Sequence, residues 1–157
     1  NSIIIDSSYN SSRLSVIQAL DLVKILSDHG EKKSLLVLGD MREMGDESRH
    51  EHEDIAIPSV KIADRIVLIG PMMKEYFYPK ALELGFEKNK IFVFDNSKAA
   101  VQEIKSKIMK DRDVILVKGS QNTLFMESIV EDLLKDPKDK LKLCRRGSYW
   151  DKIRSRH

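Results

Sequence analysis

The chain alternates short, continuous apolar runs with longer amphipathic segments. The apolar runs predict β-strands at residues 2–6, 34–38, 65–69, 91–94 and 114–117. The segments between and after them predict helices at residues 13–28, 47–61, 72–84, 98–109 and 124–135. In the first of these helices the apolar positions step by three residues, close to the helical period: Leu14, Ile17, Leu20, Val23 and Leu26.

The predicted strands are apolar throughout and do not alternate with polar residues. Such strands are buried on both faces, as in a parallel sheet with helices on each side. We therefore predict an α/β fold, a doubly wound and mostly parallel sheet with helices on both faces, whose strand order the sequence leaves open. Residues 1–157 are expected to form a single domain. Residues 136–157 are expected to be a charged turn and a basic tail, with 141–144 packing onto the sheet as a strand or loop.

Composition and charge narrow the function classes. Lys plus Arg is 27 and Asp plus Glu is 25, a net charge of +2 that is too balanced to argue for nucleic acid. The 41% hydrophobic and 33% charged content is typical of a globular chain, and no apolar run approaches the roughly 20 residues of a membrane span. Cys144 is the only cysteine, which excludes an internal disulfide and a Cys-based zinc site and fits a reducing, cytoplasmic setting. Because the chain starts at Asn1 without a methionine, we expect it to be a domain of a longer protein.

The segment after the first predicted strand reads DSSYNSSR. In open parallel sheets, ligands bind beyond the carboxyl ends of the strands, so residues at such positions are candidates for binding. Ser11 or Ser12 is expected to cap the following helix. Tyr9 and Asn10 are not needed for that cap, and an aromatic ring beside an amide can hold a planar base.

The segment after the second predicted strand reads LGDMREMGDES. Gly39 permits close approach of a ligand to the backbone, and Asp40 can bind a cation, an amine or a ribose hydroxyl. His50 and His52 follow on the next predicted helix. Being two residues apart, they point to different helix faces and do not form a metal-binding pair.

The segment after the fifth predicted strand reads VKGSQN. The ammonium of Lys118 and the backbone amides of Gly119 and Ser120 can hold an anion. No GxxxxGK[ST], GxGxxG or GxSxG pattern occurs in the chain. The residues alone therefore predict an α/β domain with an anion-binding edge and go no further.

Taken together, the segments DSSYN, LGDMREMGDESRHEH and LVKGSQNTLFME resemble the C-terminal domain of the Mur ligases. That family typically shows a DDSYNANP-like segment, an LGDM-E-LG-E-S---H segment and a KGSR----ME segment in this order. The middle segment is the most specific, with matches at Gly39, Asp40, Met41, Glu43, Gly45, Ser48 and His52. The tail LCRRGSYW also resembles the ends of these ligases. Ser7 and Gln121 depart from the pattern, since the family has aspartate and arginine there.

The resemblance implies a Rossmann-like domain of an ATP-dependent ligase that forms an amide bond through an acyl phosphate. The likeness is greatest to members that add D-alanyl-D-alanine to a UDP-MurNAc-tripeptide in peptidoglycan biosynthesis. It implies that an N-terminal domain holds the UDP-sugar, and that a central domain holds the P-loop and the Mg ions. Neither domain is in this chain, which is expected to be inactive alone and monomeric.

The resemblance also implies roles for individual residues. Asp6, Tyr9 and Asn10 would approach the ribose and base of ATP. Asp40 and Met41 would line the pocket for the amino substrate. His52 is a family position, and its place on a helix favours an orienting or capping role over proton transfer. The dipeptide carboxylate or a phosphate would meet Lys118, Gly119 and Ser120.

Other interpretations remain open at this point. One is a standalone, non-catalytic module that binds a nucleotide or a peptide, which the departures at Ser7 and Gln121 would fit. Another is a ligase of the same family that adds a different amino acid or works outside peptidoglycan. Folate-type ligases share the architecture, but their middle segments do not read GDM-E-G. The basic tail is more typical of a solvated chain end than of a nucleic-acid site.

Overall fold

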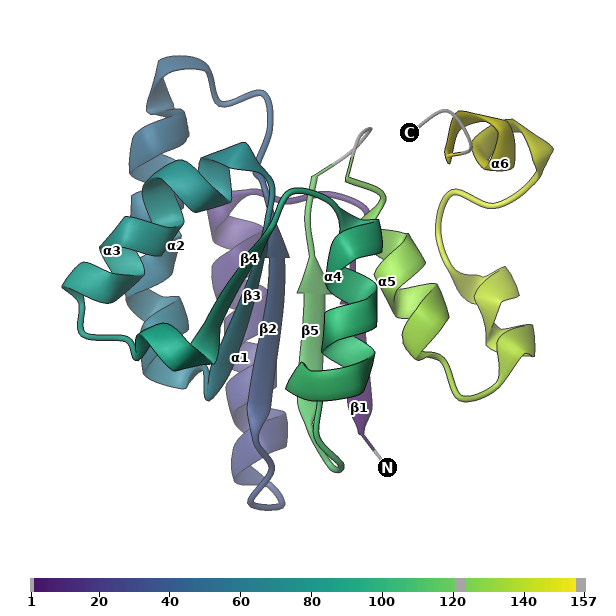
Figure 1. Ribbon diagram of the computed structural model, residues 1–157, viewed down its shortest axis with the longest axis horizontal. Helices are drawn as coiled ribbons and strands as arrows, with labels where there is room; N and C mark the ends of the chain where they lie inside the picture. The colour runs from purple at the N-terminus through teal and green to yellow at the C-terminus, as the bar shows by residue number, and fades with distance from the viewer. Residues whose placement is uncertain (1, 121–123, 155–157) are drawn as a thin grey trace.

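A computed structural model describes residues 2–120 and 124–154. Its sheet has five strands in the order β1-β5-β2-β3-β4, and every pairing is parallel (Figure 1). The strands are β1 (Ile3–Ser7), β2 (Ser34–Gly39), β3 (Arg65–Ile69), β4 (Ile91–Phe94) and β5 (Val114–Lys118). The predicted α/β class with a parallel sheet is confirmed, and each strand lies within a residue or two of its predicted bounds.

The helices follow the predicted positions, with differences in detail. They are α1 (Arg13–Asp28), α2 (Ser48–Ile62), α3 (Tyr78–Glu83), α4 (Ser97–Glu103), α5 (Met126–Leu133) and α6 (Ser148–Arg154). Short 3₁₀ turns form η1 (Gly45–Glu47), η3 (Lys88–Lys90) and η5 (Pro137–Lys142), and π-helical turns form η2 (Met73–Phe77) and η4 (Ile104–Ile108). In the tail, residues 141–144 form no strand; Leu143 packs against the core from a loop, which was the other predicted form, and α6 was not predicted. Within the described part of the chain, no helix has both the length and the apolar character to cross a bilayer.

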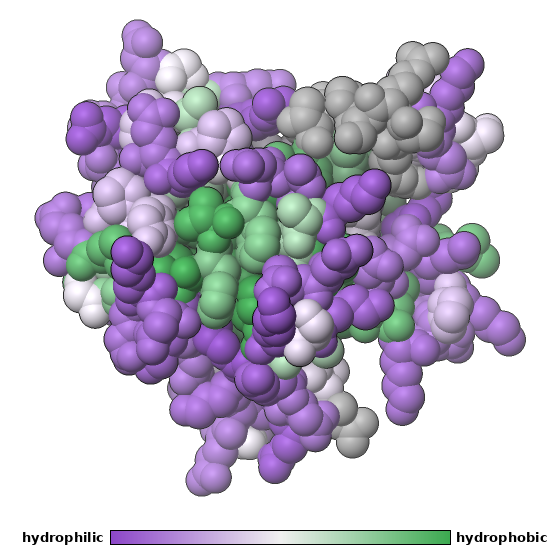
Figure 2. Space-filling view, in the orientation of Figure 1, coloured by the Kyte–Doolittle hydropathy of each residue, from purple (hydrophilic) through white to green (hydrophobic). Residues whose placement is uncertain are grey.

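The core consists of two layers, one on each face of the sheet. Successive strand residues point to opposite faces, so Leu36 and Leu38 of β2 pack toward α1, α2 and η2, while Leu35 and Val37 pack toward α4 and α5. The side chains on both faces of the central strands are therefore excluded from solvent, which explains the continuous apolar runs of these strands. The edge strand β4 is less covered, and Figure 2 shows hydrophobic side chains at the centre of one face, surrounded by hydrophilic ones.

The carboxyl ends of all five strands meet at one edge of the sheet, the upper edge in Figure 1. After β1 and β2 the chain turns to helices on one face, whereas after β5 it turns to α5 on the opposite face. Because β5 lies between β1 and β2, the chain diverges on both sides of β5. Such divergence opens crevices that bind ligands in open α/β sheets.

A capping box begins α1 directly after this edge. The Ser12 hydroxyl accepts the backbone N–H of Ser15 at 3.4 Å, and the Ser15 hydroxyl accepts the backbone N–H of Ser12 at 2.9 Å. The two bonds satisfy N–H groups that would otherwise have no partner in the first turn. The prediction that one of two serines caps this helix is confirmed, and the cap fixes where the loop after β1 ends.

Candidate functional site

Ser120 joins the three loops that the sequence singled out. Its backbone N–H donates to the carbonyl oxygen of Asp40 at 3.2 Å, and its hydroxyl accepts the N–H of Arg42 at 3.0 Å. The same hydroxyl donates to the carbonyl oxygen of Ser11 at 3.3 Å. Ser120 is buried, with 4% of its surface exposed. Segments that lie far apart in the sequence are thus tied together at one edge of the sheet.

A cavity of about 530 Å³ opens between the ends of β5, β2 and β3, and we call it the Asp40 cavity. The loop between β2 and α2 supplies most of its wall, and η2 and the residues before it close the far side. The lining residues are Asn10, Asp40, Met41, Arg42, Glu43, Met44, Gly45, Ser48, Pro71, Met72, Tyr76 and Ser120.

Asp40 lines this cavity and also holds the start of the segment after β3. Its Oδ1 accepts the backbone N–H of Met73 at 2.9 Å. Burial raises the pKa of the Asp40 carboxyl above its usual value, and the N–H groups of Met73 and Met72 act in the opposite direction. Gly70 makes room for the carboxylate: it has a φ of +109°, and a Cβ added there would lie 2.6 Å from the Asp40 carboxylate. The carboxylate is therefore part of the scaffold of the cavity.

His52 holds the other wall of the Asp40 cavity from behind. The imidazole is fully buried, and its Nε2 accepts the backbone N–H of Met41 at 3.0 Å. The proton of the neutral ring therefore lies on Nδ1, 2.6 Å from the carbonyl oxygen of Ser48, to which it donates. This geometry agrees with an orienting role. Tyr76, whose ring centroid is 6.3 Å from that of His52, also lines the cavity, although no motif in the sequence pointed to it.

A second cavity of about 480 Å³ lies on the other side of β5, and we call it the Lys118 cavity. The loop between β1 and α1 forms most of it, together with the end of β5 and part of the C-terminal tail. The lining residues are Asp6, Ser7, Ser8, Tyr9, Asn10, Ser12, Ser15, Lys118, Lys142 and Cys144.

Lys118 is the buried cation of the Lys118 cavity. Its side chain is 1% exposed, and Nζ donates to the carbonyl oxygen of Asn10 at 2.8 Å and to the Ser7 hydroxyl at 3.2 Å. No described carboxylate forms an ion pair with it, and burial lowers the pKa of the ammonium to about 8. A buried cation bonded to neutral oxygens has charge to offer to an anion that enters the cavity.

The structure groups the predicted site residues differently from their order in the sequence. Asp6, Tyr9 and Asn10 line the Lys118 cavity, and Asp6 shapes its loop by accepting the N–H and the hydroxyl of Ser8 at 3.0 and 2.6 Å. Asp40, Met41 and Ser120 line the Asp40 cavity, and Asn10 lines both cavities. Lys118 lies with Asp6 and Tyr9, not with Ser120.

Gly119 belongs to neither lining. A Cβ added to Gly119 would lie 2.5 Å from Cγ of Met126, so glycine lets α5 pack closely against the end of β5. Gln121, where the family has arginine, lies outside the described residues. Among residues 2–120 and 124–154, no three His, Cys, Asp or Glu side chains gather as a metal site. The Mg ions that the resemblance implies are expected in the central domain, which is not part of this chain.

The sequence model described as "Mur ligase, glutamate ligase domain" matches residues 1–121. The chain belongs to the Mur ligase family. Two curated relatives carry the name UDP-N-acetylmuramoyl-tripeptide–D-alanyl-D-alanine ligase. The one from Buchnera aphidicola is 34% identical over 142 residues, which are 89% of this chain and 28% of the relative. The one from Bacillus subtilis is 33% identical over 135 residues, which are 85% of this chain and 28% of the relative.

Solved structures share the fold. The MurF ligase from Thermotoga maritima in complex with ADP has a TM-score of 0.58 at 20% identity, over 88% of this chain and 28% of that chain. The second crystal structure of MurF from Acinetobacter baumannii has a TM-score of 0.64 at 24% identity, over 85% of this chain and 28% of that chain. The present chain thus spans about 28% of the length of each of these relatives.

Proposed function

We propose that the chain is the C-terminal domain of an ATP-dependent ligase that adds D-alanyl-D-alanine to UDP-MurNAc-tripeptide in peptidoglycan biosynthesis. The carrying observation is the junction at Ser120, which unites the three family segments around two adjacent cavities. The names and the 33–34% identity of the curated relatives support the choice of substrate. We assign the UDP-sugar site, the ATP-cleaving groups and the Mg ligands to parts of the protein outside this chain. The whole ligase is proposed to act in the cytoplasm.

In this reaction ATP activates a carboxylate of the tripeptide as an acyl phosphate. The amine of D-alanyl-D-alanine attacks the acyl carbon, which gives the amide, ADP and phosphate. No residue of this chain is assigned to bond making or breaking. Its contribution is to bind and orient the amino substrate and to exclude water from an acyl phosphate that water would hydrolyse. The chain alone is expected to be inactive.

The Asp40 cavity is assigned to the dipeptide. Met44 and Met72 offer apolar surface to its two methyl groups, while Arg42 and Glu43 offer charges of both signs to its carboxylate and ammonium ends. His52 holds the backbone of Met41 in place, so this part of the wall is formed before the ligand arrives. Preorganisation of this kind lowers the ordering cost of binding.

The Lys118 cavity is assigned to a phosphate-bearing part of the nucleotide. A hydrogen bond from a lysine ammonium to an anion is worth about 1.5–3 kcal/mol. Tyr9, which is 58% exposed at the rim, offers a ring on which a base can stack. Because Lys118 shares its cavity with Tyr9 and Asp6, we assign it to a phosphate and not to the dipeptide carboxylate.

The test uses the complete protein that contains this chain. Phosphate release is measured with ATP and UDP-MurNAc-tripeptide, with and without D-alanyl-D-alanine, and with L-alanyl-L-alanine as the matched control. We expect release that depends on the D,D-dipeptide and is absent with the L,L-dipeptide. Nucleotide or dipeptide binding by the complete protein without any turnover would favour the non-catalytic module instead.

A further inference from the structure

We infer that Arg145 is a positioning residue through which the C-terminal strap, residues 143–150, fixes the loop between β1 and α1. The strap thereby sets the shape of the Lys118 cavity. The inference rests on the proposed function only for the identity of the ligand, because the contacts themselves are internal to the chain. The strap lies beyond residue 121, where the match to the family's sequence model ends.

The guanidinium of Arg145 reaches two elements at once. Nη1 donates to Oε2 of Glu127 in α5 at 2.9 Å and to the carbonyl oxygen of Ser8 at 3.3 Å. Nη2 donates to the carbonyl oxygen of Tyr9 at 2.6 Å. The planar fork of arginine thus holds two consecutive carbonyl groups of the loop while its charge is balanced by Glu127.

Burying the Arg145–Glu127 ion pair costs free energy of desolvation, which the contacts of the pair have to offset. The side chains of Arg145 and Glu127 are 2% and 0% exposed. Charges removed from water are tolerated when they are paired and their remaining hydrogen-bonding groups are satisfied. Arg145 also has a φ of +52°, a left-handed conformation that is unfavourable for a residue with a side chain. Such a conformation persists where the surroundings over-determine it, and the contacts of Arg145 with α5 and the loop do so here.

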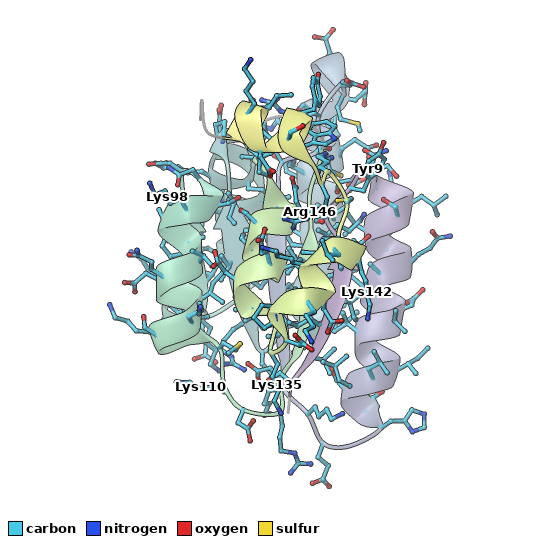
Figure 3. The ribbon with its side chains drawn as sticks, turned by 90° about the vertical axis from the view of Figure 1, so that its right-hand side faces the viewer. Tyr9, Lys98, Lys110, Lys135, Lys142 and Arg146 are labelled. Atoms are coloured by element: carbon cyan, nitrogen blue, oxygen red, sulfur yellow. The ribbon has the colours of Figure 1, made fainter. Side chains whose placement is uncertain are left out.

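The same side chain fixes the orientation of Tyr9. The guanidinium carbon lies 5.0 Å from the centroid of the Tyr9 ring and 5.9 Å from that of Trp150, both within cation–π range. Figure 3 shows the C-terminal segment passing in front of α5 toward the start of α1, where Tyr9 lies. Arg145 holds the Tyr9 ring, while the exposed part of Tyr9 remains available to a ligand.

Arg146 provides a matched control on the same strap. Its Nη1 pairs with Glu131, which lies one helical turn after Glu127 on α5. The two side chains are more exposed than the Arg145–Glu127 pair, at 19% and 35%. Arg146 thus fastens the strap to α5, but no hydrogen bond or ring contact joins it to the described residues of the β1–α1 loop. Figure 3 shows Arg146 over α5, at a distance from Tyr9.

The experiment compares three variants by amide hydrogen exchange over residues 6–12 of this chain and by ATP affinity of the complete protein. The double variant Glu127→Gln with Arg145→Met removes both buried charges and so avoids an unpaired carboxylate. We expect loop exchange to rise at least about 10-fold and ATP affinity to fall about 10-fold, about 1.4 kcal/mol. Arg145→Lys keeps the ion pair but lacks the fork, and we expect intermediate values. Arg146→Met should leave both readouts within about twofold.

Two results would overturn the inference. One is unchanged loop exchange in the double variant while its exchange in the sheet shows that it remains folded. The other is an equal change in Arg146→Met, which would mean that any loosening of the strap has the same effect. If the complete wild-type protein does not bind ATP, the proposed function fails, and the exchange data still decide whether Arg145 positions the loop.

Discussion

The two cavities flank the same strand, but they use their polar groups in opposite ways. In the Asp40 cavity, Asp40 and His52 are committed to backbone N–H groups at 2.9 and 3.0 Å, so the polar side chains hold the wall. In the Lys118 cavity, Lys118 is bonded to neutral oxygens and keeps a buried charge with a lowered pKa. The difference teaches that residues of one family pattern can serve as scaffold on one side of a strand and, on the other, keep a charge that is not paired with a described carboxylate.

The largest expected effect is a loss of stability on the scaffold side. Gly70→Ala places a Cβ 2.6 Å from the Asp40 carboxylate and forces alanine into a φ of +109°. We expect the free energy of unfolding in urea to fall by about 4 kcal/mol, from strain and overpacking together. Gly147→Ala is the matched control, because Gly147 has a φ of +100° but no atom within 4 Å of an added Cβ. That control should lose about 1–2 kcal/mol. Equal losses would remove the Asp40 carboxylate from the argument.

His52→Ala tests whether the wall of the Asp40 cavity depends on the imidazole. The change leaves the buried N–H of Met41 without its acceptor and leaves a void, so we expect a loss of about 3 kcal/mol in the free energy of unfolding. His50→Ala, at an exposed position of the same helix, should change it by less than about 0.5 kcal/mol. In the complete protein, KM for the dipeptide should rise while KM for ATP stays unchanged. A selective rise in KM for ATP would contradict the division between the cavities.

Ser7→Asp tests whether the ammonium of Lys118, which is not paired with a described carboxylate, matters for ATP binding. Ser7 Oγ lies 3.2 Å from Nζ of Lys118, so a carboxylate at this position can pair with the ammonium. We expect the pKa of Lys118 to rise toward its ordinary value. The family pattern has aspartate at this position, so the variant also restores the family residue. If the free charge of Lys118 binds the phosphate in this chain, ATP affinity, measured by calorimetry on the complete protein, falls about 10-fold, about 1.4 kcal/mol, whereas unchanged or higher affinity would assign the phosphate to other groups. Ser7→Asn, with a neutral side chain of the same shape, should have an effect below about threefold. Equal effects would indicate that shape at position 7 matters and that charge does not.

The last expected effect is a pH dependence of stability, which tests the same ammonium without changing its neighbours. The pKa of Lys118 is about 8 in the folded chain and about 10.5 when the lysine is solvated. Between these values the unfolded state binds the additional proton, so stability rises as pH increases through this window. Lys118→Met should lack this contribution, and the difference between the two curves of unfolding free energy isolates it from other titrating groups. ATP affinity of the complete protein should fall above about pH 8. Parallel stability curves would show that the ammonium is not desolvated.

Local patterns predicted the fold class and most element bounds, because continuous apolar runs and the three-residue step of α1 arise from burial near each residue. The sites needed long-range information. Lys118, Gly119 and Ser120 are adjacent in sequence, and the prediction grouped them as one anion site. At the end of a strand, however, successive residues point to opposite sides. Lys118 therefore reaches the loop after β1, while Gly119 packs on Met126.

The C-terminal tail likewise could not be predicted from local sequence patterns. Its basic residues predict a solvated end, since composition cannot distinguish an exposed arginine from a buried one. Arg145 is buried because Glu127 lies opposite it on α5, and that proximity depends on the path of the chain after η5. The position of Glu127 in a family segment was visible in the sequence, but its partner was not.

The strand order also has a consequence for how the molecule assembles. Strand β1 is synthesised before the other four strands of the sheet, yet among the described residues it pairs only with β5, through contacts such as Ile3 with Val114. The β2–β3–β4 part of the sheet can form from neighbouring segments, whereas β1 has no partner in the sheet until β5 has been synthesised. Contacts between distant segments slow folding. We therefore expect the loop after β1, and with it the Lys118 cavity, to be completed late, when β5 inserts between two strands that precede it.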